Sequence, residues 1–124
     1  MNARIVVAVG RGSLRATLDA ALAQAGFQVT SRCATARDAV EAVARDRPDV
    51  CIIDADLPGG ALLAAAAIAS PPAPPAVLVI DPGAGDAAPR AAELAGASGF
   101  LRDIDDDRLA DLVKALAQRR ELEQ

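Results

Sequence analysis

Several of the side chains that most often carry enzyme chemistry are missing from this sequence. Its 124 residues include no histidine, tryptophan or tyrosine, and the aromatic residues are Phe27 and Phe100. Without an imidazole the chain has no Ser-His-Asp arrangement, no imidazole general base and no histidine ligand for a metal. Hydrophobic residues make up 52% of the chain, and much of that share is alanine. We therefore expect a core built from closely spaced layers of small side chains.

An excess of basic charge and long apolar runs are also lacking. The formal net charge is −4, with both signs spread along the chain, which argues against a nucleic-acid surface in this domain and against a polybasic membrane patch. The alanine-rich stretch 61–69 is far too short to span a bilayer. The apolar start breaks at Gly10 and does not resemble a signal peptide. We expect a cytoplasmic domain that contacts neither nucleic acid nor membrane.

Cysteine is scarce, and its spacing predicts no metal site or redox motif. Cys33 and Cys51 are the two cysteines, and they form no CxxC pair. Cys51 lies inside an apolar run, where a buried free thiol is the usual finding. Cys33 could be a reactive thiol, although no neighbouring residue favours its thiolate.

Short apolar runs alternate with longer amphipathic ones along the whole chain. We expect strands at 4–9, 27–31, 49–54, 76–80 and 99–101, and helices at 13–26, 35–48, 59–70, 87–97 and 103–124. Ser13 and Thr35 are the expected N-caps of the first two helices, and Gly26 is a natural residue just beyond the first. This alternation predicts right-handed crossovers and a parallel sheet covered by helices on both faces. In such sheets, functional residues gather at the carboxyl ends of the strands.

The first of these ends, "VVAVGRGSLR", begins like a nucleotide-binding loop. A dinucleotide fingerprint needs a third glycine where the chain has Arg15. The second strand also ends without an acidic residue to bind a ribose, and no GKS or GKT follows Gly12. A tight turn between strand and helix is the favoured interpretation.

Two other segments are more informative. Asp54 closes a fully apolar strand and is followed by Leu57-Pro58-Gly59, and "AGASGFL" spans residues 95–101. An aspartate at a strand end is by itself often a helix cap or a solvated loop residue. At this spacing, however, the two segments together resemble response-regulator receiver domains, most closely those attached to helix-turn-helix output domains.

The resemblance implies an α/β, (βα)5 flavodoxin-like three-layer sandwich, with a parallel five-stranded sheet in the order 2-1-3-4-5. It implies a receiver-like domain over residues 1–118, with residues 119–124 as the start of a linker or C-terminal tail. A DNA-binding output domain would lie outside this chain. The face formed by the fourth helix, fifth strand and fifth helix would bind a protein partner or a second copy.

The resemblance also assigns positions, several of which carry the wrong residue for phosphorylation. Asp54 holds the phosphoacceptor position, and Asp56 holds the position whose carbonyl binds the metal. Gly10 and Arg11 stand where the family has two acidic metal ligands. Asp81 stands where the family has a hydroxyl switch residue, and Pro82 where it has a small residue. Phe100 holds the aromatic switch position. The position of the family's lysine falls on Asp103 (or Arg102).

These departures remove most of the charge neutralisation that phosphoryl transfer requires. The remaining candidate ligands for Mg²⁺ are Asp54 and Asp56, and a phosphoryl group on Asp54 would face the like charges of Asp81 and Asp103. We expect no cofactor, no metal and no enzymatic activity. The interpretation is an atypical receiver domain, or pseudo-receiver, that regulates an output domain without conventional Mg²⁺-dependent phosphorylation.

The sequence leaves several alternatives open. The domain could be a working phosphoacceptor modified on Asp54, or a flavodoxin-like protein that binds a flavin or nucleotide. Arg11 could neutralise the Asp54–Asp81 cluster in place of a cation, or it could point into solvent. The loop 81–86, "DPGAGD", could hold a small molecule through its backbone N–H groups, or could be a flexible connection.

Overall fold

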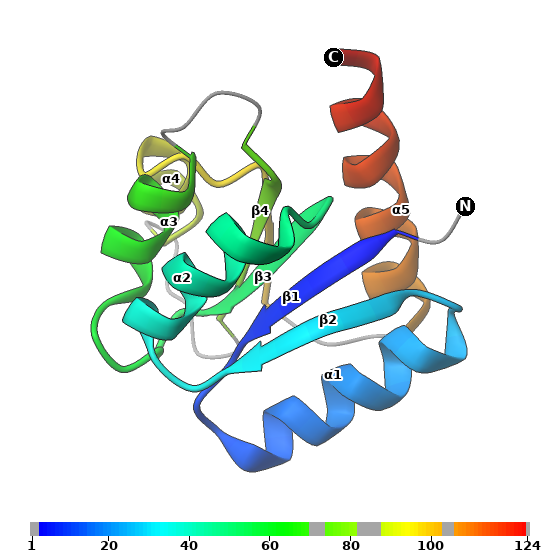
Figure 1. Cartoon of the computed structure of the whole chain (residues 1–124), viewed down its shortest axis with the longest axis horizontal. Coiled ribbons are helices and arrows are strands. Elements are labelled where there is room, and N and C mark those ends of the chain that lie inside the picture. Colours follow the sequence, from blue (N-terminus) through cyan, green and yellow to red (C-terminus); the bar gives the residue numbers. More distant parts are fainter. Residues whose placement is uncertain (1–2, 70–73, 82–87, 103–105, 124) are drawn as a thin grey trace.

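The chain forms a five-stranded parallel sheet with helices on both faces (Figure 1). The computed structural model describes residues 3–69, 74–81, 88–102 and 106–123. The strands have the spatial order β2-β1-β3-β4-β5, so the expected fold and strand order are confirmed. The elements are β1 (Arg4–Ala8), α1 (Gly12–Gln24), β2 (Gln28–Cys33), α2 (Ala36–Asp46), β3 (Val50–Asp54), α3 (Ala61–Ala69), β4 (Ala76–Ile80), α4 (Ala88–Leu94), β5 (Gly99–Leu101) and α5 (Asp106–Glu123).

The sheet separates two apolar cores. Figure 1 shows α2, α3 and α4 on one side of the sheet, and α1 and α5 on the other. Because successive side chains of a strand point to opposite faces, Val6, Cys51 and Val77 pack on the side of α2, α3 and α4. Their neighbours Ile5, Ile52 and Leu78 pack on the side of α1 and α5. The central strands are buried on both faces, which explains their continuous apolar sequences.

Two of the three residues predicted from the sequence to mark helix ends do so in the structure. The predicted N-cap at Thr35 is confirmed, because its side-chain oxygen accepts the Asp38 N–H at 3.2 Å. Gly26 has a φ of +84°, in agreement with its predicted place just beyond α1. The prediction that Ser13 caps α1 is wrong. The Arg15 N–H already donates to the Arg11 carbonyl at 3.0 Å, so the helix begins at Gly12 and Arg11 is its N-cap.

Other predicted bounds shift by a few residues. The second strand continues to Cys33, and α5 begins at Asp106. The same helix runs without interruption past residue 118 to Glu123. The loop residues 82–86, with Pro82 among them, and Asp103 lie outside the described residues. Among the helices that are described, none combines the length and the hydropathy that crossing a bilayer would need.

Both cysteines are free and buried. Burial strongly raises the pKa of the Cys51 thiol, and the prediction of a buried free thiol is confirmed. Burial also raises the pKa of Cys33, which is 6% exposed. Because the thiolate is the reactive form, the structure does not favour a reactive Cys33.

A small polar cluster ties the edge strand β2 to the end of α2. Ser31 Oγ donates to Asp46 Oδ2 at 2.5 Å, and Arg45 Nε donates to Asp46 Oδ1 at 2.9 Å. Arg45 Nη2 also donates to Ser31 Oγ at 2.9 Å. The hydrogen bonds from Arg45 and Ser31 lower the pKa of Asp46 to about 2.

This cluster makes stability depend on pH. The carboxyl group of Asp46 has an ordinary pKa of 3.8, so its stabilisation is present above pH 4 and is lost as the pH falls toward 2. We expect Asp46→Asn to lower the free energy of unfolding by about 1–2 kcal/mol at pH 7. Urea unfolding at several pH values should show this difference shrink between about pH 4 and pH 2. Glu41→Gln is the control, because Glu41 pairs with Arg37 at an exposed position. It should change the free energy of unfolding by less than about 0.5 kcal/mol. An effect of Asp46→Asn that does not vary with pH would contradict the prediction.

Candidate functional site

A buried carboxylate lies at the carboxyl end of β3. Asp54 is 0% exposed, and among the described residues it is the one charged side chain that is fully buried. Its position follows from the sequence, because the strand that it closes is apolar throughout and occupies the middle of the sheet. A buried carboxylate is costly unless charged or hydrogen-bonding groups compensate it. The surroundings of Asp54 therefore decide what this site can do.

Arg11 compensates Asp54 through a two-pronged contact. Arg11 Nε donates to Asp54 Oδ2 at 2.8 Å, and Arg11 Nη2 donates to Asp54 Oδ1 at 2.5 Å. The backbone N–H of Asp56 adds a third hydrogen bond, to Asp54 Oδ1 at 3.0 Å. Of the two alternatives for Arg11, the ion pair with Asp54 is the one present, and the alternative in which Arg11 points into solvent is wrong.

Arg11 keeps its positive charge in this environment. The hydrogen bond to Asp54 raises the pKa of Arg11 above its ordinary value, and the charges of Asp54, Asp56 and Asp81 act in the same direction. Arg11 Nη1 also lies 3.6 Å from Asp56 Oδ2, a carboxylate that is 70% exposed. One permanent cation thus sits among the acidic side chains of this edge of the sheet.

The backbone explains why this arginine reaches the carboxylate. Arg11 is the N-cap of α1, with extended backbone angles, and β1 lies directly beside β3, with Ala8 opposite Ile53. Gly10 is pressed against the loop that follows β3, because a Cβ atom at this position would lie 3.0 Å from Pro58 Cδ. An acidic residue at position 10 would therefore require Pro58 to move.

The described residues at this edge do not fit a Mg²⁺ ion. Magnesium prefers six oxygen ligands in a near-octahedral arrangement. Both carboxylate oxygens of Asp54 already accept hydrogen bonds from a guanidinium, and positions 10 and 11 offer no carboxylate. Within the described ranges no group of three or more acidic, histidine or cysteine side chains is placed to hold a metal.

The remaining site positions lie around the ends of β4 and β5. Asp81 follows β4, is half-buried, and donates its backbone N–H to the Leu101 carbonyl at 2.9 Å. Phe100 is half-buried on β5 and packs against the core on the side of α2, α3 and α4. Arg102 is exposed. The other candidate for the lysine position, Asp103, falls outside the described residues.

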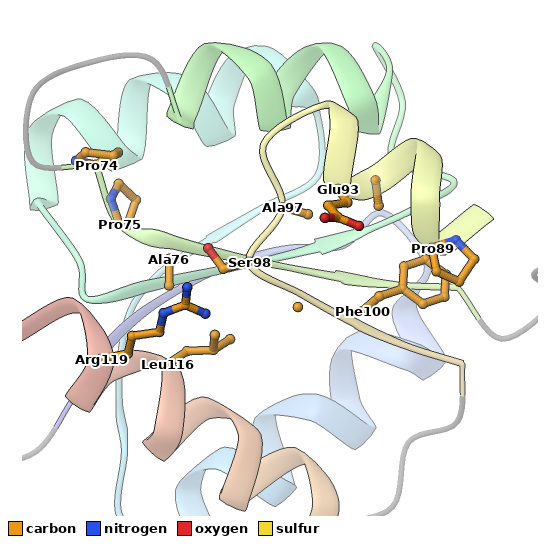
Figure 2. Close-up of a pocket in the computed structure, with 12 residues that line it drawn as sticks. Pro74, Pro75, Ala76, Pro89, Glu93, Ala97, Ser98, Phe100, Leu116 and Arg119 are labelled. Atoms are coloured by element: carbon orange, nitrogen blue, oxygen red, sulfur yellow. The ribbon is translucent and has the colours of Figure 1, made fainter. Parts of the chain in front are cut away.

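A groove of about 510 Å³ lies along β5 between α4 and α5. Figure 2 shows Glu93 of α4 and Arg119 of α5 on opposite sides of it, with Phe100 and Pro89 together at one end. Pro74 and Pro75 lie at the other end. The family resemblance predicts this face, but no local pattern in the sequence assigns its prolines or charged residues to it. The segment 71–75 indicated only a stiff connection, because nothing local shows which surface a loop borders.

Comparisons with solved structures agree with this fold. The sequence matches no protein-family model and no curated protein. Solved structures do match, and the fold is that of response-regulator receiver domains. The signal receiver domain of NarL from Mycobacterium tuberculosis is 28% identical, with a TM-score of 0.89 over 94% of this chain and 97% of that chain.

Two further structures share the fold at lower identity. A two-component response regulator of the LuxR family from Aurantimonas is 24% identical, with a TM-score of 0.87 over 97% of this chain and 88% of that chain. The beryllofluoride-activated receiver domain of RstA from Klebsiella pneumoniae is 18% identical, with a TM-score of 0.83 over 92% of this chain and 97% of that chain. These likenesses confirm the receiver fold.

Proposed function

We propose that this chain is an atypical receiver domain of a two-component regulator, in which Arg11 takes the place of the metal cation. One observation carries the proposal: the guanidinium of Arg11 holds both carboxylate oxygens of the buried Asp54. The domain would act as a cytoplasmic regulatory module and not as an enzyme, and its state would depend on protein contacts.

The physical argument concerns the nucleophile. Phosphoryl transfer depends on positioning and on neutralising the charge of the phosphoryl oxygens. Attack by Asp54 would require one carboxylate oxygen to leave Arg11, which separates a buried charge from its partner. The incoming group would also approach Asp81, where the family places a hydroxyl. Both effects oppose phosphorylation.

The output contact is proposed at the groove along β5. Phe100 links this groove to the core, and Glu93 and Arg119 give it one acidic and one basic side chain. We propose that a protein partner or a second copy binds there, and that a DNA-binding domain outside this chain receives the signal. The likeness to regulators of the LuxR family, one of which is described as DNA-binding, supports the latter.

Beryllofluoride with Mg²⁺ tests the proposal, because this complex mimics a phosphoryl group on an aspartate. We expect amide NMR spectra of the wild-type chain to show no saturable shift around Asp54. Arg11→Asp removes the competing cation and adds a carboxylate, so it should gain Mg²⁺-dependent shifts at that edge. Arg37→Asp makes the same change of charge at an exposed position on α2 and should gain none.

The opposite result would favour the second candidate, a working phosphoacceptor. Saturable shifts around Asp54 in the wild-type chain, absent in Asp54→Asn, would overturn the proposal. A flavin absorbance in the purified protein would instead support a flavodoxin-like function.

A further inference from the structure

A hollow of about 890 Å³ lies at the amino ends of the strands, and we call it the amino-end hollow. Figure 1 shows the end of α1 and the starts of β1 and β2 beside α5 at this place. Residues that follow α2 complete its wall. Asp54 stands at the carboxyl end of β3, so this hollow lies at the opposite edge of the sheet from the Arg11–Asp54 pair.

Three basic residues from distant parts of the chain line the amino-end hollow. Arg4 comes from β1, Arg47 follows α2, and Lys114 comes from α5. All three are exposed, and no carboxylate of the described residues lies within ion-pair distance of them. Four arginines elsewhere on the described surface each have an acidic partner. Basic groups without an ion pair therefore gather at this hollow, although the chain as a whole carries a net charge of −4.

The other residues of the hollow only partly offset this positive charge. Asp49 and Asp111 are its two acidic residues, and Asp49 Oδ2 already accepts the backbone N–H of Arg4 at 2.9 Å. Three cations against two carboxylates leave one positive charge in excess. Gln28 and Gln118 add side-chain amides that can donate hydrogen bonds. The hollow thus combines cations and neutral donors, which are the groups that recognise anions.

The backbone at Arg47 gives a second, independent observation. Arg47 is the C-cap of α2, with a φ of 49°, and it is the one non-glycine residue with a positive φ in the described ranges. Glycine is the usual residue in this conformation at a helix end, because a Cβ atom makes it unfavourable. An arginine here therefore carries backbone strain that a glycine would avoid. Such strain is typical of positions whose side chain has a function.

We propose that the amino-end hollow binds a small polyanion, a molecule with two or more phosphate or carboxylate groups. Guanidinium groups match the geometry of both anions, and cations supplied by three different elements can engage more than one anionic group. The volume of the hollow lies within the range of small-molecule sites, about 300–1,000 Å³. A bound polyanion would connect α5 to β1 and to the end of α2. This inference does not depend on the proposed role of Arg11 and Asp54.

Titration of the whole chain with pyrophosphate and with citrate, followed by amide NMR without added metal ions, tests the proposal. We expect saturable shifts at the hollow with at least one of them, with a Kd on the order of 0.1–1 mM at low salt. Raising NaCl from about 50 mM to about 300 mM should weaken the binding, because salt screens exposed charges. Shifts with pyrophosphate alone would identify phosphate groups as the ligand, and shifts with citrate alone would identify carboxylates. No saturable shift at the hollow with either probe would overturn the proposal.

Arg47→Gly separates a binding role of this arginine from a structural one. It removes a cation and relieves the backbone, so it should weaken anion binding at least about fivefold while Tm stays unchanged or rises. Lys114→Gln should weaken binding to a similar extent. Arg90→Gln is the matched control, because it removes an exposed arginine on α4, outside the hollow, and it should bind as the wild type does.

Arg47 could instead stabilise the end of α2 through the helix dipole. Arg47→Gly would then lower Tm and leave the affinity for both probes unchanged, which would overturn the proposal. An affinity that falls as much in Arg90→Gln as in Arg47→Gly and Lys114→Gln would overturn it too, because the binding would then follow the net charge of the chain and not this hollow.

Discussion

Replacing Arg11 with alanine is expected to lower the free energy of unfolding by about 2–4 kcal/mol. The change leaves Asp54, which is 0% exposed, without the two hydrogen bonds that Arg11 donates. Removing one partner of a buried ion pair is costly because the other charge stays buried and uncompensated. The expected loss is below that of a fully buried pair because Arg11 is itself 43% exposed.

Urea unfolding at pH 7 measures this effect, and two further variants identify its cause. Arg37→Ala removes an arginine that is 88% exposed and paired with Glu41 at 3.4 Å, so it should change stability by less than about 0.5 kcal/mol. Arg11→Ala combined with Asp54→Asn should be more stable than Arg11→Ala alone, because the buried charge is gone. If Arg11→Ala costs no more than Arg37→Ala, the pair does not stabilise the site.

The second large effect is expected at Gly96, between α4 and β5. Gly96→Ala should lower the free energy of unfolding by about 2–4 kcal/mol. Gly96 has a φ of +103°, which a residue with a Cβ rarely adopts, and a Cβ there would lie 2.7 Å from the Cβ of Ala69. The substitution therefore combines backbone strain with a steric clash against the end of α3.

Thermal or urea unfolding separates these two causes. Gly12→Ala is the matched control, because Gly12 opens α1 and a Cβ added there would meet no atom within 4 Å. It should be neutral or stabilise by up to about 1 kcal/mol. Adding Ala69→Gly to Gly96→Ala should relieve the clash but leave the strain, so a double-mutant cycle should show a favourable coupling. A Gly96→Ala variant as stable as Gly12→Ala would rule out both causes.

Where a feature depends on neighbouring residues, it could be predicted from the sequence. Thr35 caps α2 because its side-chain oxygen accepts the N–H of Asp38, three residues further along the chain. Gly26 ends the first helix because glycine adopts a positive φ readily. Ser13 shows the limit of this reasoning, since the turn at Arg11 starts the helix earlier than the side-chain signal indicated.

Features that join distant parts of the chain were harder to predict. Arg11 and Asp54 are 43 residues apart. From the sequence, the arginine side chain could either contact the acidic residues or point into solvent. The groove along β5 draws its walls from α4, α5 and the residues before β4. The exposed side of α3 cannot be told from its buried side in the sequence, because apolar residues occupy both sides of this helix.

The sequence by itself determined the alternation of strands and helices, the parallel sheet and the place of Asp54 at a strand end, because these depend on the period of apolar residues and on local backbone preferences. Only the tertiary structure decided that Arg11 turns onto Asp54, that Pro58 closes the space beside Gly10, and that both leucines of α3 stay exposed. Each of these depends on how segments far apart in the chain are brought together, and the free energy of such a contact depends on geometry that no local pattern contains.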